Sequence, residues 1–138
     1  MRVMGGIIGR DNYIHVAYTR IVSIESNALL PLPAATFHIL VALAGEDRHG
    51  YAIMQDVAAA TAGAVKLSAG TLYRSVQRML DQGLIIEVTS RPAPELDDER
   101  RRYYRITPFG RSVAKAEARR LAEMLKLARA SGLAPGKA

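Results

Sequence analysis

Residues 100–107 are Arg-Arg-Arg-Tyr-Tyr-Arg-Ile-Thr, and they lie near the end of a stretch that begins at Pro33 and ends at Gly110. Three segments of helical periodicity come first in this stretch, and two short segments rich in strand formers follow. Three helices followed by a two-stranded hairpin form the layout of a winged helix-turn-helix. The sequence therefore predicts a mainly α fold of this class, with the hairpin as its wing.

Each of the three helical segments ends at a glycine, a residue that readily adopts the backbone conformation that follows a helix. They run from Pro33 to Gly45, from Gly50 to Gly63 and from Ser68 to Gly83. The first is apolar nearly all round, so we expect it to be covered twice, once by its own domain and once by a second copy of the chain. In the third, the Ser68 hydroxyl is expected to cap the helix by accepting a backbone N–H bond.

The wing is predicted to consist of segments 84–89 and 103–107, joined by a polar loop. Alternation along the second segment places Tyr104 and Ile106 inward, towards the core. A last helix is predicted over 108–130, with Thr107 as its N-cap. Small and apolar residues step along that helix by 4, 3, 4 and 3, at Ala114, Ala118, Leu121, Leu125 and Ala128. This spacing is typical of a coiled-coil seam, so the helix is expected to pack against a partner subunit.

The composition divides the chain into four segments. They are an N-terminal extension (1–29), a winged helix-turn-helix domain (30–107), a C-terminal dimerisation helix (108–130) and a frayed tail (131–138). The extension is expected to be loosely attached. Its arginines, Arg2, Arg10 and Arg20, leave open the alternative of a basic arm that touches DNA.

Charge and cysteine content limit the classes of function. Nineteen Lys and Arg against thirteen Asp and Glu give a net charge of +6 and a pI of about 10.0. This balance suits contact with phosphates, although many basic proteins bind no nucleic acid. The chain has no cysteine, which excludes disulfides, thiolate catalysis and Cys-based metal sites. Because no apolar run is long enough to span a bilayer, we expect no membrane contact and a cytoplasmic location.

Patterns for catalysis and metal binding are missing as well. Ser68 is not in a nucleophile elbow, no phosphate-binding loop follows a strand, and the three histidines have no metal-ligand spacing. We therefore expect no enzyme activity, no cofactor and no metal. His49 is expected to satisfy the start of the second helix, with a pH-sensitive or ligand-facing role as the alternative.

The outer face of the third helix is the strongest candidate for a binding surface. When successive residues are placed 100° apart around the helix axis, five of them lie on the side away from the core: Gly70, Thr71, Arg74, Gln77 and Arg78. Tyr73 lies at the border of this side. Arginine can bind guanine through two hydrogen bonds, glutamine matches adenine, and threonine or tyrosine can meet a thymine methyl group or a phosphate. Alone, such a face would be an ordinary solvated surface, but the preceding helix and the following wing favour DNA binding.

Two arginines on the outward side of the wing, Arg101 and Arg105, could hold phosphates without reading sequence. The loop before them is acidic, with Glu95, Asp97, Asp98 and Glu99. An equally open interpretation is that these acids pair with the arginines and keep the hairpin soluble.

Five short motifs occur once each along the chain. They are Pro33-Ala34-Ala35-Thr36-Phe37-His38-Ile39-Leu40, His49-Gly50-Tyr51-Ala52-Ile53, Gly70-Thr71-Leu72-Tyr73, Gly83-Leu84-Ile85 and Arg102-Tyr103-Tyr104-Arg105-Ile106-Thr107-Pro108-Phe109-Gly110. In this order and spacing they resemble the PadR-like transcriptional regulators, over residues 30–128 or so. The resemblance implies a homodimer whose winged helix domains bind operator DNA, mostly as a repressor, and whose C-terminal helix packs against the first helix of the partner.

The resemblance also implies that Gly70, Thr71 and Tyr73 start the recognition helix, with Tyr73 contacting DNA. Some members of the family bind phenolic acids or aromatic drugs between the subunits. A small aromatic effector is therefore left open, although this chain has no Trp to build a stacking pocket and only a short tail.

These observations predict a sequence-specific, homodimeric DNA-binding regulator that represses from a pseudo-palindromic operator in double-stranded DNA. The residues expected to contact DNA are Ser68, Gly70, Thr71, Tyr73, Arg74, Gln77, Arg78, Arg101 and Arg105. The residues expected to form the dimer seam are Leu32, Ile39, Leu43, Ala118, Leu121 and Leu125. The alternatives are a winged-helix module that binds protein, which the acidic loop favours, and a small-molecule receptor without specific DNA binding.

Overall fold

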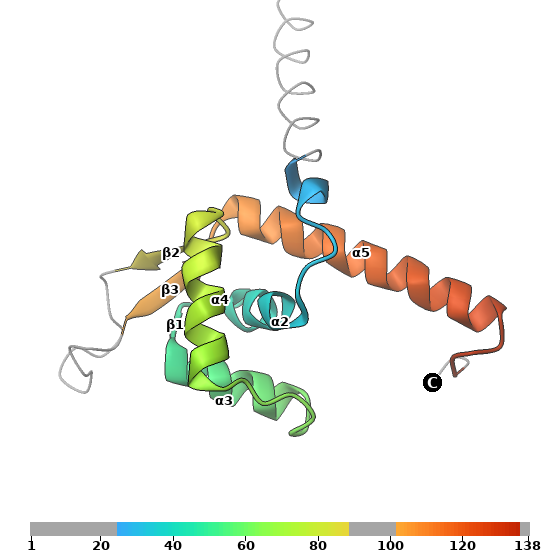
Figure 1. Cartoon of the computed structure of the whole chain (residues 1–138), viewed down its shortest axis with the longest axis horizontal. Coiled ribbons are helices and arrows are strands. Elements are labelled where there is room, and N and C mark those ends of the chain that lie inside the picture. Colours follow the sequence, from blue (N-terminus) through green and yellow to red (C-terminus); the bar gives the residue numbers. More distant parts are fainter. Residues whose placement is uncertain (1–24, 89–101, 136–138) are drawn as a thin grey trace, which may run out of the picture.

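The computed structural model describes residues 25–88 and 102–135, and it shows a mainly helical protein with one small sheet (Figure 1). The helices are α2 (Ala34–Leu43), α3 (Gly50–Ala60), α4 (Ala69–Asp81) and α5 (Pro108–Ala130), and the strands are β1 (Arg48–His49), β2 (Ile85–Val88) and β3 (Tyr103–Ile106). Three helices, a hairpin and a long last helix confirm the predicted winged helix-turn-helix.

Some predictions fall on residues outside these ranges. They concern the arm up to residue 24, the acidic loop, the phosphate contact of Arg101 and the last three residues of the tail. Residues 25–28, the first that are described, are helical and lead past α5 into α2 (Figure 1).

The sheet has a third strand that the sequence did not predict. Its strand order is β1-β3-β2, and both pairings are antiparallel. In β1, Arg48 and His49 lie opposite Tyr104 and Tyr103. Two residues are too few to show an alternating pattern, so nothing in the sequence marks this strand. Through β1 the start of α3 is attached to the wing.

The hairpin has the predicted alternation. β2 and β3 pair from Ile85 opposite Ile106 to Val88 opposite Tyr103. Tyr104 and Ile106 are buried, whereas the intervening Arg105 is exposed. The inward face of the hairpin thus closes one side of the core.

The core is built around α2, which contacts α3, α4 and α5 (Figure 1). Its residues Ile39, Leu40 and Leu43 have almost no accessible surface. The surrounding elements contribute Ile53, Leu72, Met79, Leu84 and Val113, which are also fully buried. A single protomer therefore buries most of the apolar circumference of α2 by itself.

Half of the predicted dimer seam is buried within a single protomer. Ile39 and Leu43 are 0% and 1% exposed, and Leu32 is 9% exposed, all within one protomer. Side chains with so little accessible surface have almost nothing to offer a partner subunit. Helix α5 contacts α2 and supplies part of the cover that was expected from a second copy of the chain.

The two halves of α5 differ sharply in burial. In the first half Gly110, Val113, Ala116 and Glu117 are buried, and no residue of the helix after Glu117 is. The second half projects beyond the rest of the described chain (Figure 1). Its exposed large apolar residues are Leu121, Met124, Leu125 and Leu127. None of the helices in the described ranges is long and apolar enough to cross a membrane.

The start of α5 is joined closely to the turn that follows α4. The Thr107 hydroxyl donates to the Gly83 carbonyl at 2.6 Å and accepts from the Gly110 N–H at 2.9 Å, which confirms Thr107 as the N-cap. The Thr107 N–H donates to the Leu84 carbonyl at 3.0 Å. A Cβ added to Gly110 would lie 2.0 Å from that same carbonyl oxygen, so only glycine fits at this position.

We predict that Gly110→Ala destabilises the protein by about 3 kcal/mol, because the backbone at Leu84 or the start of α5 must move to accept the methyl group. Urea denaturation followed by circular dichroism measures the loss. Gly45→Ala is the matched control, since a Cβ there meets nothing within 4 Å. Equal stability of the two variants would contradict the close approach of α5 to Leu84.

Candidate nucleic-acid interface

Helix α4 begins at the predicted cap. The Ser68 hydroxyl accepts a hydrogen bond from the Thr71 N–H at 3.1 Å, and it lies 3.0 Å from the Thr71 hydroxyl. Leu72, Val76 and Met79 are buried against the core. The opposite face is therefore held outward by a capped helix with a fully packed inner side.

The residues expected on the outer face of α4 lie there. Gly70, Tyr73, Arg74, Gln77 and Arg78 are exposed, and Thr71 is half-buried. The structure thus brings this group together on one surface, which we call the α4 face, beginning at the exposed Ser68.

The cationic side chains of the α4 face are available for an anionic partner. A Cβ at Gly70 would lie 3.2 Å from Nη1 of Arg74, so the missing side chain lets the Arg74 guanidinium lie against the first turn of the helix. Among the residues that the structure describes, no carboxylate forms an ion pair with Arg74 or Arg78. Gln77 has only a long contact, 3.5 Å, with Asp81. These polar groups can exchange water for a ligand at little cost.

Tyr73 is positioned by the start of α3. It is 51% exposed, yet a Cβ on Gly50 would lie 2.7 Å from its hydroxyl oxygen. His49 caps α3, because its Nδ1 accepts from the Ala52 N–H at 3.1 Å, and its ring meets Tyr103 edge-on at 5.4 Å. The expectation that His49 satisfies a helix start is confirmed. The sequence did not show that its neighbour Gly50 makes room for Tyr73, since the two lie on different helices.

A hollow of about 290 Å³ lies between α4 and the hairpin. It is lined by Tyr73, Val76, Gln77, Leu80, Glu87, Arg102 and Tyr104. Burial, followed by the nearby Glu87 carboxylate, raises the pKa of Tyr104, so its phenol stays protonated at neutral pH and can donate a hydrogen bond. Arg102 lies 3.5 Å from Glu87 at the rim.

Among the wing residues that the structure describes, Arg102 lies next to the α4 face, and the sequence did not indicate it. The signal was present, because Arg102 is two residues before the inward Tyr104 and so falls on the same side of the strand.

Arg105 has a different environment from the one expected. Its Nε and Nη2 donate to the two carboxylate oxygens of Asp47 at 3.0 and 2.8 Å. These hydrogen bonds raise the pKa of Arg105, which is charged at every relevant pH in any case. The pair borders a hollow beside the end of α2 and the start of α5, a different hollow from the one at α4. The structure therefore does not bring Arg105 together with the α4 face, and its acidic partner precedes β1.

Comparison with known proteins agrees with this geometry. A family model described as the PadR-like family of transcriptional regulators matches residues 39–116, more than half of the chain. This protein belongs to the PadR-like family of transcriptional regulators. The match runs from the middle of α2 to the buried half of α5, so it includes the α4 face and the wing. The chain therefore carries the DNA-binding winged helix fold of that family.

Solved structures of other regulators resemble this PadR-like protein. A transcriptional regulator from Clostridium thermocellum is 26% identical, with a TM-score of 0.59 over 69% of this chain and 86% of its own. A PadR family transcription regulator from Clostridium difficile is 24% identical, with the same TM-score over 70% and 96%. RosR from H. salinarum is 26% identical, with a TM-score of 0.52 over 71% and 78%. No curated protein sequence matches.

We predict that Gly50→Ala destabilises this PadR-like protein by about 1–3 kcal/mol, because its methyl group would meet the Tyr73 hydroxyl and a Leu72 methyl group. In the double variant Gly50→Ala/Tyr73→Phe the nearest atom is removed, so part of the loss should be recovered. Thermal unfolding of both single variants and the double variant measures this coupling. Losses that simply add would contradict the contact between Gly50 and Tyr73.

Proposed function

We propose that this PadR-like protein is a sequence-specific repressor that binds double-stranded DNA as a homodimer, with α4 in the major groove. The observation that carries the proposal is the α4 face, on which Arg74, Gln77 and Arg78 are exposed and have no strong polar partner among the described residues. Arginine and glutamine at such positions can form paired hydrogen bonds with guanine and adenine.

The neighbouring groups would position the protein on the DNA backbone. Ser68, Thr71 and Tyr73 within the α4 face and Arg102 beside it carry hydroxyl and guanidinium donors, which suit phosphate oxygens. Gly70 would allow the helix backbone to approach the DNA closely, because no side chain stands between them. Arg101 stays part of this proposal, whereas Arg105 is already held by Asp47 and is better suited to fastening β3 to the segment before β1.

The second half of α5 would supply the dimer contact. Leu121 and Leu125 are exposed there at coiled-coil spacing, and Ala118 lies one step before them. Covering exposed leucines of a projecting helix with a second copy of the chain removes apolar surface from water, which stabilises the dimer. A two-fold dimer of this kind would place its two α4 helices in successive major grooves, about 34 Å apart.

In this proposal the protein acts in the cytoplasm, needs no cofactor and catalyses no reaction. Occupancy of an operator by the dimer would prevent transcription from an overlapping promoter. Nothing in the described residues favours an aromatic effector, a protein-binding role or a receptor function over DNA binding.

We predict that Arg74→Ala weakens binding to the preferred duplex by about 1–3 kcal/mol and binding to a shuffled duplex much less, because a base contact is lost. Fluorescence anisotropy over a salt series, with DNA upstream of the protein's own gene, measures both affinities. Arg119→Ala is the matched control, since it removes the same charge from an exposed site on α5. An equal loss on both duplexes would contradict base reading by Arg74.

A further inference from the structure

Glu117 on α5 is the one charged residue that is buried among those the structure describes. It is only 2% exposed. Its Oε1 accepts from Nε of Arg120 at 2.5 Å, and its Oε2 accepts from Nη2 of Arg120 at 3.0 Å. The hydrogen bonds from Arg120 lower the pKa of Glu117, against the opposing effect of burial. A buried carboxylate is costly unless it is paired in this way, so the two side chains act as a unit.

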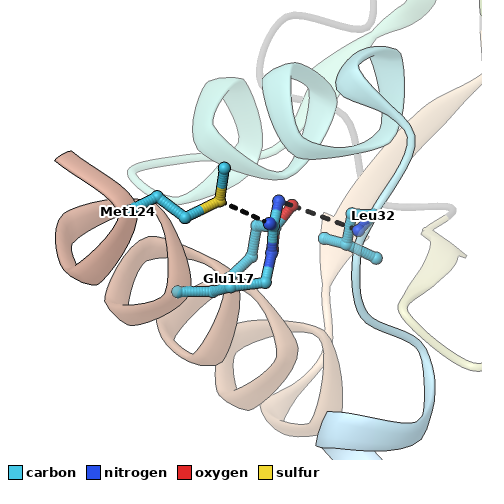
Figure 2. A network of polar contacts seen from close by, with 4 residues as sticks. Leu32, Glu117 and Met124 are labelled. Carbon is cyan, nitrogen blue, oxygen red and sulfur yellow. Dashed lines mark hydrogen bonds and ion pairs between the residues drawn. The ribbon is translucent and has the colours of Figure 1, made fainter. Parts of the chain in front are cut away.

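Glu117 also holds the segment that enters α2. The Leu32 N–H donates to Oε2 of Glu117 at 3.1 Å, across 85 residues of sequence (Figure 2). Leu32 stands between Pro31 and Pro33, neither of which has a backbone N–H. The single donor of this three-residue segment is therefore bound to α5.

The same unit reaches the exposed half of α5. Nη1 of Arg120 lies 2.9 Å from the sulfur of Met124, which is one turn further along the helix and is labelled in Figure 2. Glu117 is the last buried residue of α5. The group formed by Leu32, Glu117 and Arg120, which we call the α5 clamp, thus lies where the burial of the helix ends.

A small change at the α5 clamp would be amplified by the length of helix beyond it. Residues 118–130 form a rod of about 20 Å, so a pivot of about 10° at Glu117 moves the far end by about 3 Å. One base pair of duplex DNA also advances by about 3.4 Å. In a dimer joined through α5, a pivot of this size would change the separation of the two DNA-binding domains by about one base pair.

We propose that the α5 clamp fixes the direction in which the exposed half of α5 projects, and thereby sets the half-site spacing that the dimer accepts. The second part of this statement rests on the proposed function. Glu117 does not touch DNA, so it is a positioning residue that acts through α5. The clamp restricts the protein to operators of one spacing, in addition to the bases that the α4 face selects.

The first test measures the direction of α5 without DNA. Because the chain has no cysteine, spin labels can be placed at Gln55→Cys on α3 and Lys126→Cys on α5, both exposed, in protein diluted with unlabelled copies. Pulsed electron resonance then gives the distance between them within one protomer. Glu117→Gln should broaden or shift this distance. Glu123→Gln, which removes an exposed charge from the same helix, should not. Identical distances in all three proteins would overturn the proposal.

The second test measures affinity for duplexes in which two half-sites are moved apart in steps of one base pair. Wild type and Glu123→Gln should prefer one spacing sharply. Glu117→Gln should bind a single half-site normally, and its preference for the best spacing over its neighbours should fall several-fold. An unchanged sharp optimum in Glu117→Gln, or an equal loss on single half-sites, would overturn the role in spacing. Wild-type protein that binds no specific sequence would overturn the proposed function, while the label distances would still decide whether the clamp holds α5.

Discussion

The Leu84 carbonyl is the point at which α4, the hairpin and α5 are joined. It accepts the Thr107 N–H, and Gly110 lies so close to it that a methyl group cannot be added. Backbone segments that approach this closely can move only together, because no flexible side chain lies between them to absorb a displacement. The turn after α4, the base of the wing and the first turn of α5 therefore form one tightly packed junction, and the remaining elements pack around it.

Two exposed surfaces extend from this junction, and their chemistry differs. The α4 face is polar and carries Arg74 and Arg78, which suits a phosphate-rich partner. The second half of α5 is lined with leucines, which suits an apolar partner. The contact of Leu84 with Gly110 and Thr107 connects the two surfaces through the backbone, so the position of one depends on the position of the other. The α5 clamp at Glu117 lies where the burial of α5 ends.

The sequence predicted the parts of the fold that depend on local patterns. The Ser68 cap and the exposed face of α4 follow from apolar residues spaced three and four positions apart within a single helix. Long-range partners were not predictable. The sequence of an apolar helix such as α2 does not show whether its own chain or a second copy covers Ile39. Arg105 pairs with Asp47, which is 58 residues away in the sequence. In the sequence, Glu117 looks like an ordinary surface carboxylate three residues before an arginine. Its burial depends on tertiary packing, which the local sequence does not reveal.

The proposed placement of two α4 helices on one duplex is tested most directly by hydroxyl-radical footprinting. Duplexes that the full-length protein selects from a random pool would be cleaved in its presence, and protection read at each nucleotide. We expect two protected tracts on one face of the DNA, with centres about 10 base pairs apart, as for paired recognition helices in successive major grooves. A single protected tract, or a pool that yields no shared sequence, would contradict a dimer that reads two half-sites.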